Sequence, residues 1–192
     1  ENLTGEDFAI MAAAYLRVPG NVVKAETAAE KAISLDTSVA GKVAIMESLA
    51  TAYAAQQDWA SQYKWLDRKN TLKPDNSARN YFFLADAAHK AKDFEAAQRV
   101  ASNYIKDFPD QAQGYFLKWR SAIAADPDTS KGSALATVDE YNNFLMKDTA
   151  KNKRRIINNH GYKIYYYIVK AQDFQKAIEA ADAILALDPT DP

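Results

Sequence analysis

The segment DFEAAQRVASNYIKDFP, residues 93–109, decides the fold, because its spacing occurs twice more in the chain. Residues 58–74 read DWASQYKWLDRKNTLKP, and residues 173–189 read DFQKAIEAADAILALDP. Each copy begins with an aspartate and an aromatic residue, and each ends with a proline 16 positions after the aspartate. A unit repeated at this spacing is typical of stacked helical repeats rather than of a catalytic pocket.

Each part of the repeated unit has a physical role. The aspartate can accept a hydrogen bond from a free N–H group at the start of a helix. The aromatic residue then falls in the first turn, where it can wedge between two helices of a hairpin. The proline ends the helix, because it lacks an N–H group and clashes with the preceding turn. A helical run and a short polar turn precede each aspartate, so the unit is predicted to be a helical hairpin.

Apolar residues in the last unit recur at steps of three and four, which is the period of an amphipathic helix. They are Gly161, Ile164, Tyr165, Ile168, Phe174, Ala177, Ala181, Ile184, Leu185 and Leu187. This pattern predicts two packed helices, with Tyr165 at a packing position. The small side chains of Ala97 and Ala177 are predicted to lie at the closest contact inside their hairpins, where they allow two helix axes to approach.

The repeated unit resembles that of the tetratricopeptide-repeat family, a helix pair of about 34 residues with a closing proline. The match is carried by an acid, an aromatic residue and a small residue at fixed spacing: Asp93, Phe94 and Ala97, and Asp173, Phe174 and Ala177. The copy at 58–74 is weaker, because Gln62 stands in the small-residue position. The resemblance is to a divergent bacterial member. It implies an all-α fold, a right-handed α-solenoid of about five hairpins and ten helices.

The hairpins are expected to form one domain, residues 1–192. Their predicted ranges are 5–37, 38–74, 75–109, 110–148 and 149–189. Thr37 takes the place that proline has at the end of the repeated segments. Independent bundles are the alternative, but no Gly/Ser-rich or Pro-rich linker separates two hairpins. The chain begins at Glu1 without methionine, and no capping helix follows Pro192, so we expect a fragment of a longer protein.

The composition agrees with a helical repeat. Of the 192 residues, 48% are hydrophobic, which is enough to bury a core as a strip between neighbouring repeats. The formal net charge is −1, so no long-range field attracts nucleic acid or an acidic membrane. The absence of cysteine excludes disulfides and thiolate chemistry. No segment approaches the roughly 20 apolar residues that span a membrane.

The sequence contains no recognisable catalytic constellation. His89 and His160 fall in different hairpins, without other ligands at metal-binding spacing. The chain has no glycine-rich phosphate loop and no nucleophile motif. We therefore expect a protein that is not an enzyme, with no catalytic, cofactor-binding or metal-binding residues.

A basic run comprises Lys147, Lys151, Lys153, Arg154 and Arg155. It could contact phosphate or an acidic peptide. The alternative, which the neutral net charge favours, is a solvated helix start. Positive charge is mildly unfavourable at a helix N-terminus, so the run is worth testing.

The family resemblance implies that the first helix of each hairpin lines a concave groove. Its groove positions fall on Glu47, Thr51, Phe82, Asp86, Tyr162 and Tyr166, with Asn159 and Lys163 beside the last pair. Exposed aromatic residues with amide and basic neighbours suit peptide binding. The alternative is that the tyrosines pack between helices. The lysine and asparagine clamp that the best-known members use on C-terminal carboxylates is absent from these positions.

The sequence therefore predicts a protein–protein interaction scaffold that binds a peptide or protein partner in a concave groove. One alternative is a helical-repeat nucleic-acid binder that uses the basic run at 147–155. The other is an accessory region of a longer enzyme or sensor. The resemblance to bacterial members favours an extracytoplasmic location over the cytoplasm.

The last helix is predicted to leave an apolar end face uncovered. That face comprises Ile178, Ala181, Asp182 and Leu185. Stacked repeats bury such a strip only against the following repeat. The face therefore predicts self-association, or stabilisation by native sequence beyond Pro192.

Overall fold

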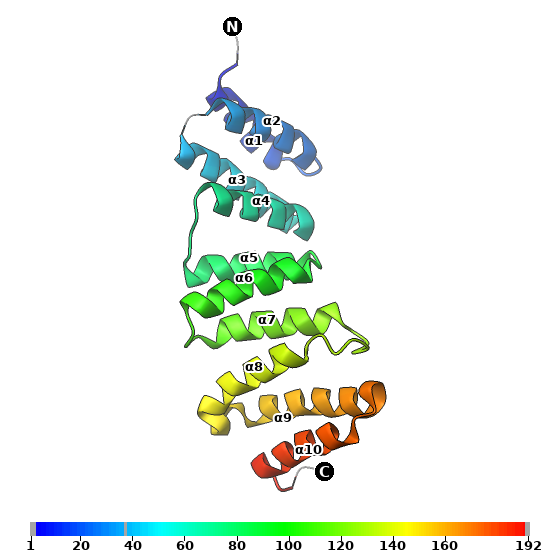
Figure 1. Ribbon diagram of the computed structural model, residues 1–192. Helices are drawn as coiled ribbons and strands as arrows, with labels where there is room; N and C mark the ends of the chain where they lie inside the picture. Colours follow the sequence, from blue (N-terminus) through cyan, green and yellow to red (C-terminus); the bar gives the residue numbers. More distant parts are fainter. Residues whose placement is uncertain (1–2, 37, 191–192) are drawn as a thin grey trace. The chain divides into compact units, whose positions relative to one another are not determined.

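The computed structural model describes residues 3–36 and 38–190, and these ranges contain helices and turns but no strand (Figure 1). The all-α prediction is thereby confirmed. Thr37, the predicted end of the first hairpin, lies outside the described residues. The chain divides into two compact units, Glu1–Asp93 and Phe94–Pro192. The single-domain organisation stays a prediction.

Unit 1 contains five helices that pack as neighbours in chain order (Figure 1). They are α1 (Gly5–Leu16), α2 (Val22–Leu35), α3 (Val39–Ala55), α4 (Trp59–Leu72) and α5 (Ala78–Lys90). The core of the first two hairpins is rich in alanine: Ala25 and Ala29 of α2 are fully buried, together with Leu49 and Trp65. Side chains this small allow α1 and α2 to pack closely.

Unit 2 contains the remaining helices, α6 (Phe94–Asp107), α7 (Ala112–Ala125), α8 (Leu135–Leu145), α9 (Thr149–Tyr165) and α10 (Phe174–Leu187). A 3₁₀ turn, η1 (Met146–Asp148), leads into α9, and a π-helical segment, η2 (Tyr166–Ala171), follows it. The core between α7, α8 and α9 is aromatic. Tyr141 and Ile156 are fully buried there, and Phe116 and Trp119 pack against them.

Two of the repeated aspartates, Asp58 and Asp173, cap helices as predicted. The Asp58 carboxylate accepts a hydrogen bond from the backbone N–H of Ser61 at 3.1 Å, at the start of α4. The Asp173 carboxylate accepts one from Lys176 at 3.2 Å, at the start of α10. This backbone hydrogen bond is the main reason that the pKa of Asp173 lies below its usual range. Both caps satisfy N–H groups that a helix leaves unpaired at its first turn.

The residue before each repeated aspartate has a left-handed backbone. Gln57, Lys92 and Gln172 have φ angles of 59°, 62° and 52°. A left-handed residue closes the C-terminus of a helix, and glycine is the usual choice there. None of the three is glycine, so the sequence carried no signal for this conformation.

The turn in the last hairpin differs from the other two by one residue. Asp58 and Asp93 each donate the backbone N–H to the carbonyl five residues earlier, at 3.0 Å. Asp173 donates instead to the carbonyl of Tyr167, six residues earlier, at 2.8 Å. The π-helical segment η2 thus holds one extra residue between α9 and the turn.

The extra residue changes which side chains of the last hairpin are buried. Counting back from Asp173 predicted Tyr165 at a packing position, but its exposed fraction is 48%. Ile168, on the same predicted face, is 45% exposed. The positions that pack against the rest of the hairpin lie one residue earlier in the sequence than predicted. A shift of one residue turns a side chain by about 100° around the helix axis. Phe174 is 62% exposed, so the prediction that it wedges between helices is also wrong.

Candidate functional site

Unit 1 has a pocket of about 510 Å³ between α3, α4 and α5. It is lined by Glu47, Ala50, Thr51, Ala54, Gln62, Leu66, Lys69, Asp75, Arg79, Asn80 and Phe83. We call it the unit 1 groove. It brings together two of the predicted groove residues, Glu47 and Thr51.

The charges of the unit 1 groove are balanced. Lys69 forms a salt bridge with Glu47 at 3.4 Å and donates a hydrogen bond to Asn80 at 3.4 Å. The Arg79 guanidinium lies 5.6 Å from the centroid of the Phe83 ring, which is 46% exposed. This groove therefore presents an aromatic surface with neutralised charges.

The other two residues predicted for unit 1 do not line this groove. Phe82 makes an edge-to-face contact with Phe83, with ring centroids 5.5 Å apart. Asp86 forms a salt bridge with Lys90 at 2.8 Å along α5. Sequence reasoning missed Phe83, Arg79 and Lys69. The family's groove positions cover only one face of each first helix, and they include no residue of the second helix α4, where Lys69 lies.

Unit 2 has a pocket of about 520 Å³ between α7 and α9. It is lined by Phe116, Trp119, Lys151, Asn152, Arg154, Arg155, Asn158 and Asn159. We call it the unit 2 groove. Three cations line it, and none of its described lining residues is acidic.

The basic run divides into two sets in the structure. Lys147 forms a salt bridge with Asp110 at 3.4 Å, and Lys153 forms one with Asp188 at 2.8 Å. The other three members, Lys151, Arg154 and Arg155, line the unit 2 groove. The run therefore comprises two lysines in ion pairs and three exposed cations that line the groove.

Arg155 is exposed in the unit 2 groove, but its guanidinium is held in place. Its guanidinium donates a hydrogen bond to the Tyr141 hydroxyl at 2.8 Å and lies 5.8 Å from the centroid of the Phe116 ring. Burial raises the pKa of Tyr141, and the Arg155 charge opposes that shift, so the hydroxyl stays a neutral acceptor. Arg120 lies 5.8 Å from the Phe116 centroid as well.

Two asparagines of the unit 2 groove hold the structure together. The Asn159 side chain is 1% exposed and donates to the Asn142 side chain at 2.7 Å. Asn152 donates to the backbone carbonyl of Leu145 at 3.0 Å. Asn159 was predicted beside the groove, but its amide joins α9 to α8 rather than facing a partner.

The groove residues predicted in the last hairpin pack against other residues of unit 2. Lys163 forms a salt bridge with Asp139 at 2.7 Å, and its side chain is 18% exposed. Tyr162 is half-buried, and burial is the main reason that its pKa is raised. The ring of Tyr166 packs on Gly132 in the loop between α7 and α8, where a side chain would clash with it. Tyr162 and Tyr166 are thus partly buried against their own unit, and their contact with a partner stays a prediction.

The extra residue of η2 explains why Tyr162 and Tyr166 do not line the unit 2 groove. Tyr162 and Tyr166 were placed by counting back from Asp173, as Glu47 and Thr51 were from Asp58. With the extra residue of η2, the matching positions on α9 are Gly161 and Tyr165. Both are exposed, and no atom of another element lies within 4 Å of the point that a Gly161 side chain would occupy.

These positions extend the unit 2 groove along α9. Lys151, Arg154, Asn158, Gly161 and Tyr165 follow one another at steps of three and four, so they lie on one face of the helix. All five are exposed. We call them the α9 stripe.

The described residues contain no group of histidine, cysteine, aspartate or glutamate side chains that could hold a metal ion. Burial is the main reason that the pKa of His160 is lowered, which favours its neutral form. Within the described ranges, no helix combines the length and the apolar character that crossing a membrane requires. Arginine, aromatic and amide groups of the kind found here suit binding of a partner.

The chain is similar to known proteins in structure. No family model matches the sequence, and no curated protein matches it. The structure is similar to the C-terminal part of a TPR repeat-containing protein from Cytophaga hutchinsonii, with a TM-score of 0.61 and 21% identity over 99% of this chain and 71% of that one.

Two further solved structures are similar at 14% identity. One is BtubC from P. vanneervenii, with a TM-score of 0.51 over 96% of this chain and 79% of that one. The other is a putative kinesin light chain with nearly identical TPR-like repeats from Podosopora anserina, with a TM-score of 0.50 over 95% and 93%. Helix pairs, capping aspartates and these similarities agree: the chain has a tetratricopeptide-repeat-like fold.

Proposed function

We propose that this protein is a non-enzymatic scaffold that binds a peptide or protein partner in the grooves along its first helices. One observation carries the proposal. Each unit has a pocket of 510 to 520 Å³ in which successive first helices supply side chains, α3 and α5 in unit 1 and α7 and α9 in unit 2. Pockets of about 300–1,000 Å³ are the size that binds small ligands and side chains.

The side chains of the two grooves support binding over catalysis. Arginine and aromatic residues contribute most of the energy at protein interfaces, and both grooves combine them. In the unit 1 groove Arg79 contacts Phe83, and in the unit 2 groove Arg155 contacts Phe116. Neither groove contains a histidine or a hydrogen-bonded nucleophile and base.

The test is an unbiased selection. A random peptide library displayed on phage would be panned on the purified chain, and enriched peptides would be titrated against Phe83→Ala and Arg154→Ala variants. We expect each enriched peptide to lose affinity for one of the two variants. Val23→Ala is the matched control, because Val23 is 73% exposed on α2 and lines neither groove. The proposal is wrong if no peptide is enriched, or if the enriched peptides bind both groove variants unchanged.

A further inference from the structure

The unit 2 groove carries an excess of positive charge, because three cations and no acid are among its described lining residues. Lys151 and Arg154 are exposed and form no salt bridge with the described residues. The neighbouring acids have other partners: Asp188 pairs with Lys153 at 2.8 Å, and the Asp148 carboxylate accepts the backbone N–H of Lys151 at 3.2 Å as the cap of α9. The formal net charge of the whole chain is −1, so this cationic groove is a local feature.

Arg155 is preorganised to bind a planar anion. One of its terminal nitrogens is held by the Tyr141 hydroxyl, and its guanidinium lies over the Phe116 ring. The remaining N–H groups of the guanidinium stay available as a fork, which matches the two oxygens of a carboxylate. Because the side chain is already anchored, little conformational entropy is lost when it binds.

The α9 stripe has the spacing of an extended peptide. At a rise of 1.5 Å per residue, Arg154 and Asn158 lie about 6 Å apart along the helix axis. Side chains on one face of an extended chain repeat about every 7 Å. A peptide that follows the stripe can therefore place one carboxylate near Lys151 and Arg154 and the next group near Asn158. Gly161 leaves the path open beyond that point.

The aromatic residues of the groove favour a peptide over a nucleic acid. Single-stranded nucleic acid binds by stacking its bases on aromatic faces. The guanidinium groups of Arg120 and Arg155 each lie 5.8 Å from the centroid of the Phe116 ring, which leaves little of that ring for a base.

We infer that the unit 2 groove binds an extended acidic peptide, whose carboxylates pair with Lys151, Arg154 and Arg155. This inference rests on the proposed function and names the partner class for one of the two grooves. The carboxylates can come from aspartate and glutamate side chains or from a peptide C-terminus. Both present the same planar anion to the arginine fork.

Fluorescence anisotropy with three labelled peptides tests the inference. The first alternates aspartate and glutamate with leucine, the second is the same peptide with an amidated C-terminus, and the third replaces every acid with its amide. We expect the first to bind and the third to bind at least about tenfold more weakly, because charge-assisted hydrogen bonds are lost. Unchanged binding of the amidated peptide assigns the side chains as the source, and its loss assigns the C-terminus.

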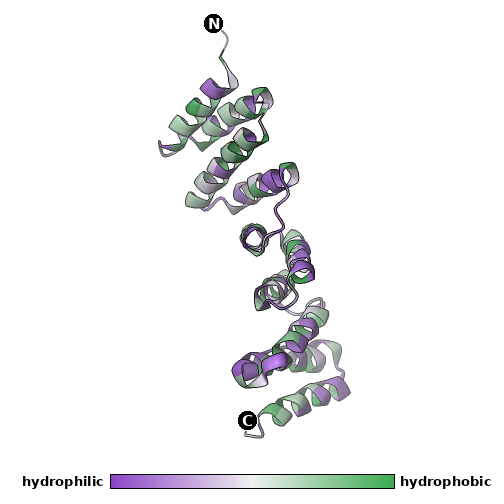
Figure 2. Cartoon of the chain, turned by 90° about the vertical axis from the view of Figure 1, so that its left-hand side faces the viewer, coloured by the Kyte–Doolittle hydropathy of each residue, from purple (hydrophilic) through white to green (hydrophobic). Residues whose placement is uncertain are grey.

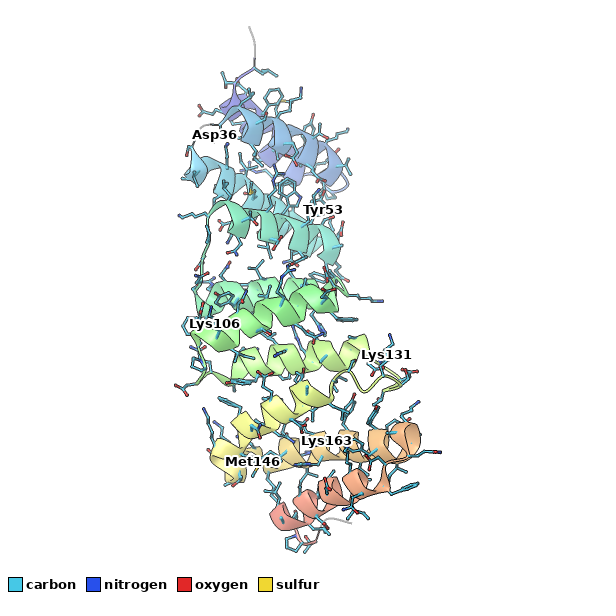
Figure 3. The ribbon with its side chains drawn as sticks, in the orientation of Figure 1. Asp36, Tyr53, Lys106, Lys131, Met146 and Lys163 are labelled. Atoms are coloured by element: carbon cyan, nitrogen blue, oxygen red, sulfur yellow. The ribbon has the colours of Figure 1, made fainter. Side chains whose placement is uncertain are left out.

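The decisive variant is the double change Lys151→Glu and Arg154→Glu, which reverses two exposed charges without touching the core. It should weaken binding of the acidic peptide by at least about tenfold. Lys131→Glu is the matched control, because Lys131 is exposed in the loop at the opposite end of unit 2 from Met146 and the start of α9 (Figure 3). A thermal melt of each variant verifies that it is folded.

Four results would overturn the inference. Equal affinity for the acidic peptide and its amide counterpart would show that carboxylates are not recognised. Equal effects of the double variant and Lys131→Glu would place binding elsewhere. A single-stranded uridine oligonucleotide that displaces the acidic peptide and binds more tightly would assign the groove to nucleic acid. Library peptides that contain no acidic residue and bind unit 2 would contradict this inference but not the proposed function. A library selection that enriches no peptide would contradict the proposed function itself.

Discussion

The left-handed residues before the repeated aspartates predict that glycine at these positions stabilises the protein. Gln57 has a φ of 59° and is exposed. A non-glycine residue in this conformation is destabilised by roughly 1–2 kcal/mol. Glycine removes that strain but loses roughly 0.5–1 kcal/mol through its greater freedom in the unfolded chain. The expected net change for Gln57→Gly is a gain of about 0.5–1 kcal/mol in the free energy of unfolding.

The three turns lie in separate hairpins, so their effects should add. Gln57→Gly, Lys92→Gly and Gln172→Gly together are expected to contribute about 1.5–3 kcal/mol. Urea unfolding followed by circular dichroism measures the change. With a slope of about 2–3 kcal/mol per molar, a single substitution raises the midpoint by about 0.3 M.

The neighbouring residue supplies the control. Gln56 has a φ of −91°, so Gln56→Gly relieves no strain and should destabilise by roughly 0.5–1 kcal/mol. If Gln57→Gly lowers the urea midpoint as much as Gln56→Gly does, the left-handed turn is not a source of strain and the reasoning fails.

Other predictions concern the core, one ion pair and the end face. Leu49→Ala removes a fully buried side chain and should reduce the free energy of unfolding by about 2–5 kcal/mol, whereas a melting temperature equal to the parent's would mean the site collapses freely. Lys153 holds the pKa of Asp188 at about 2, so Lys153→Ala should raise that pKa toward the usual range in an NMR titration, and an unchanged titration would disprove the pairing. The contribution of this pair to stability is present above the usual carboxyl pKa and is lost as the pH falls toward 2. Ile178 and Leu185 are 54% and 47% exposed on α10, and their joint replacement by glutamate should abolish self-association in sedimentation; a parent protein that is monomeric at every concentration would contradict this prediction.

The repeated spacing was enough to predict the helical fold and its caps. Asp58 and Asp173 are helix caps because short side-chain acceptors satisfy free N–H groups locally, and a local interaction can be recognised in a sequence. The exposed face of α10 matches its prediction in part, since Ala181 is partly buried, and self-association stays a prediction. Figure 2 shows hydrophobic and hydrophilic residues mixed along this helix, and Ile178 and Leu185 are among the exposed hydrophobic ones.

The candidate site was harder to predict, because it depends on register. No amino-acid composition is characteristic of a π-helical turn. Nothing in the tyrosine-rich segment therefore indicated that the backbone N–H of Asp173 donates to the carbonyl of Tyr167 rather than to that of the next residue. Lys151 and Arg154 were singled out as part of the basic run but were not placed in a groove. Their position depends on α7, whose Phe116 and Trp119 lie too far away in the sequence to be paired with them by spacing.

The π-helical segment η2 affects how this repeat can be compared with others and engineered. Aligned by its capping aspartate, the last hairpin needs a one-residue gap between Tyr165 and Asp173 before its first helix corresponds to α3. Without that gap, each grafted residue would point about 100° away from its intended direction. A consensus repeat could therefore not replace this hairpin position by position, and the binding surface of α9 would be lost in the exchange.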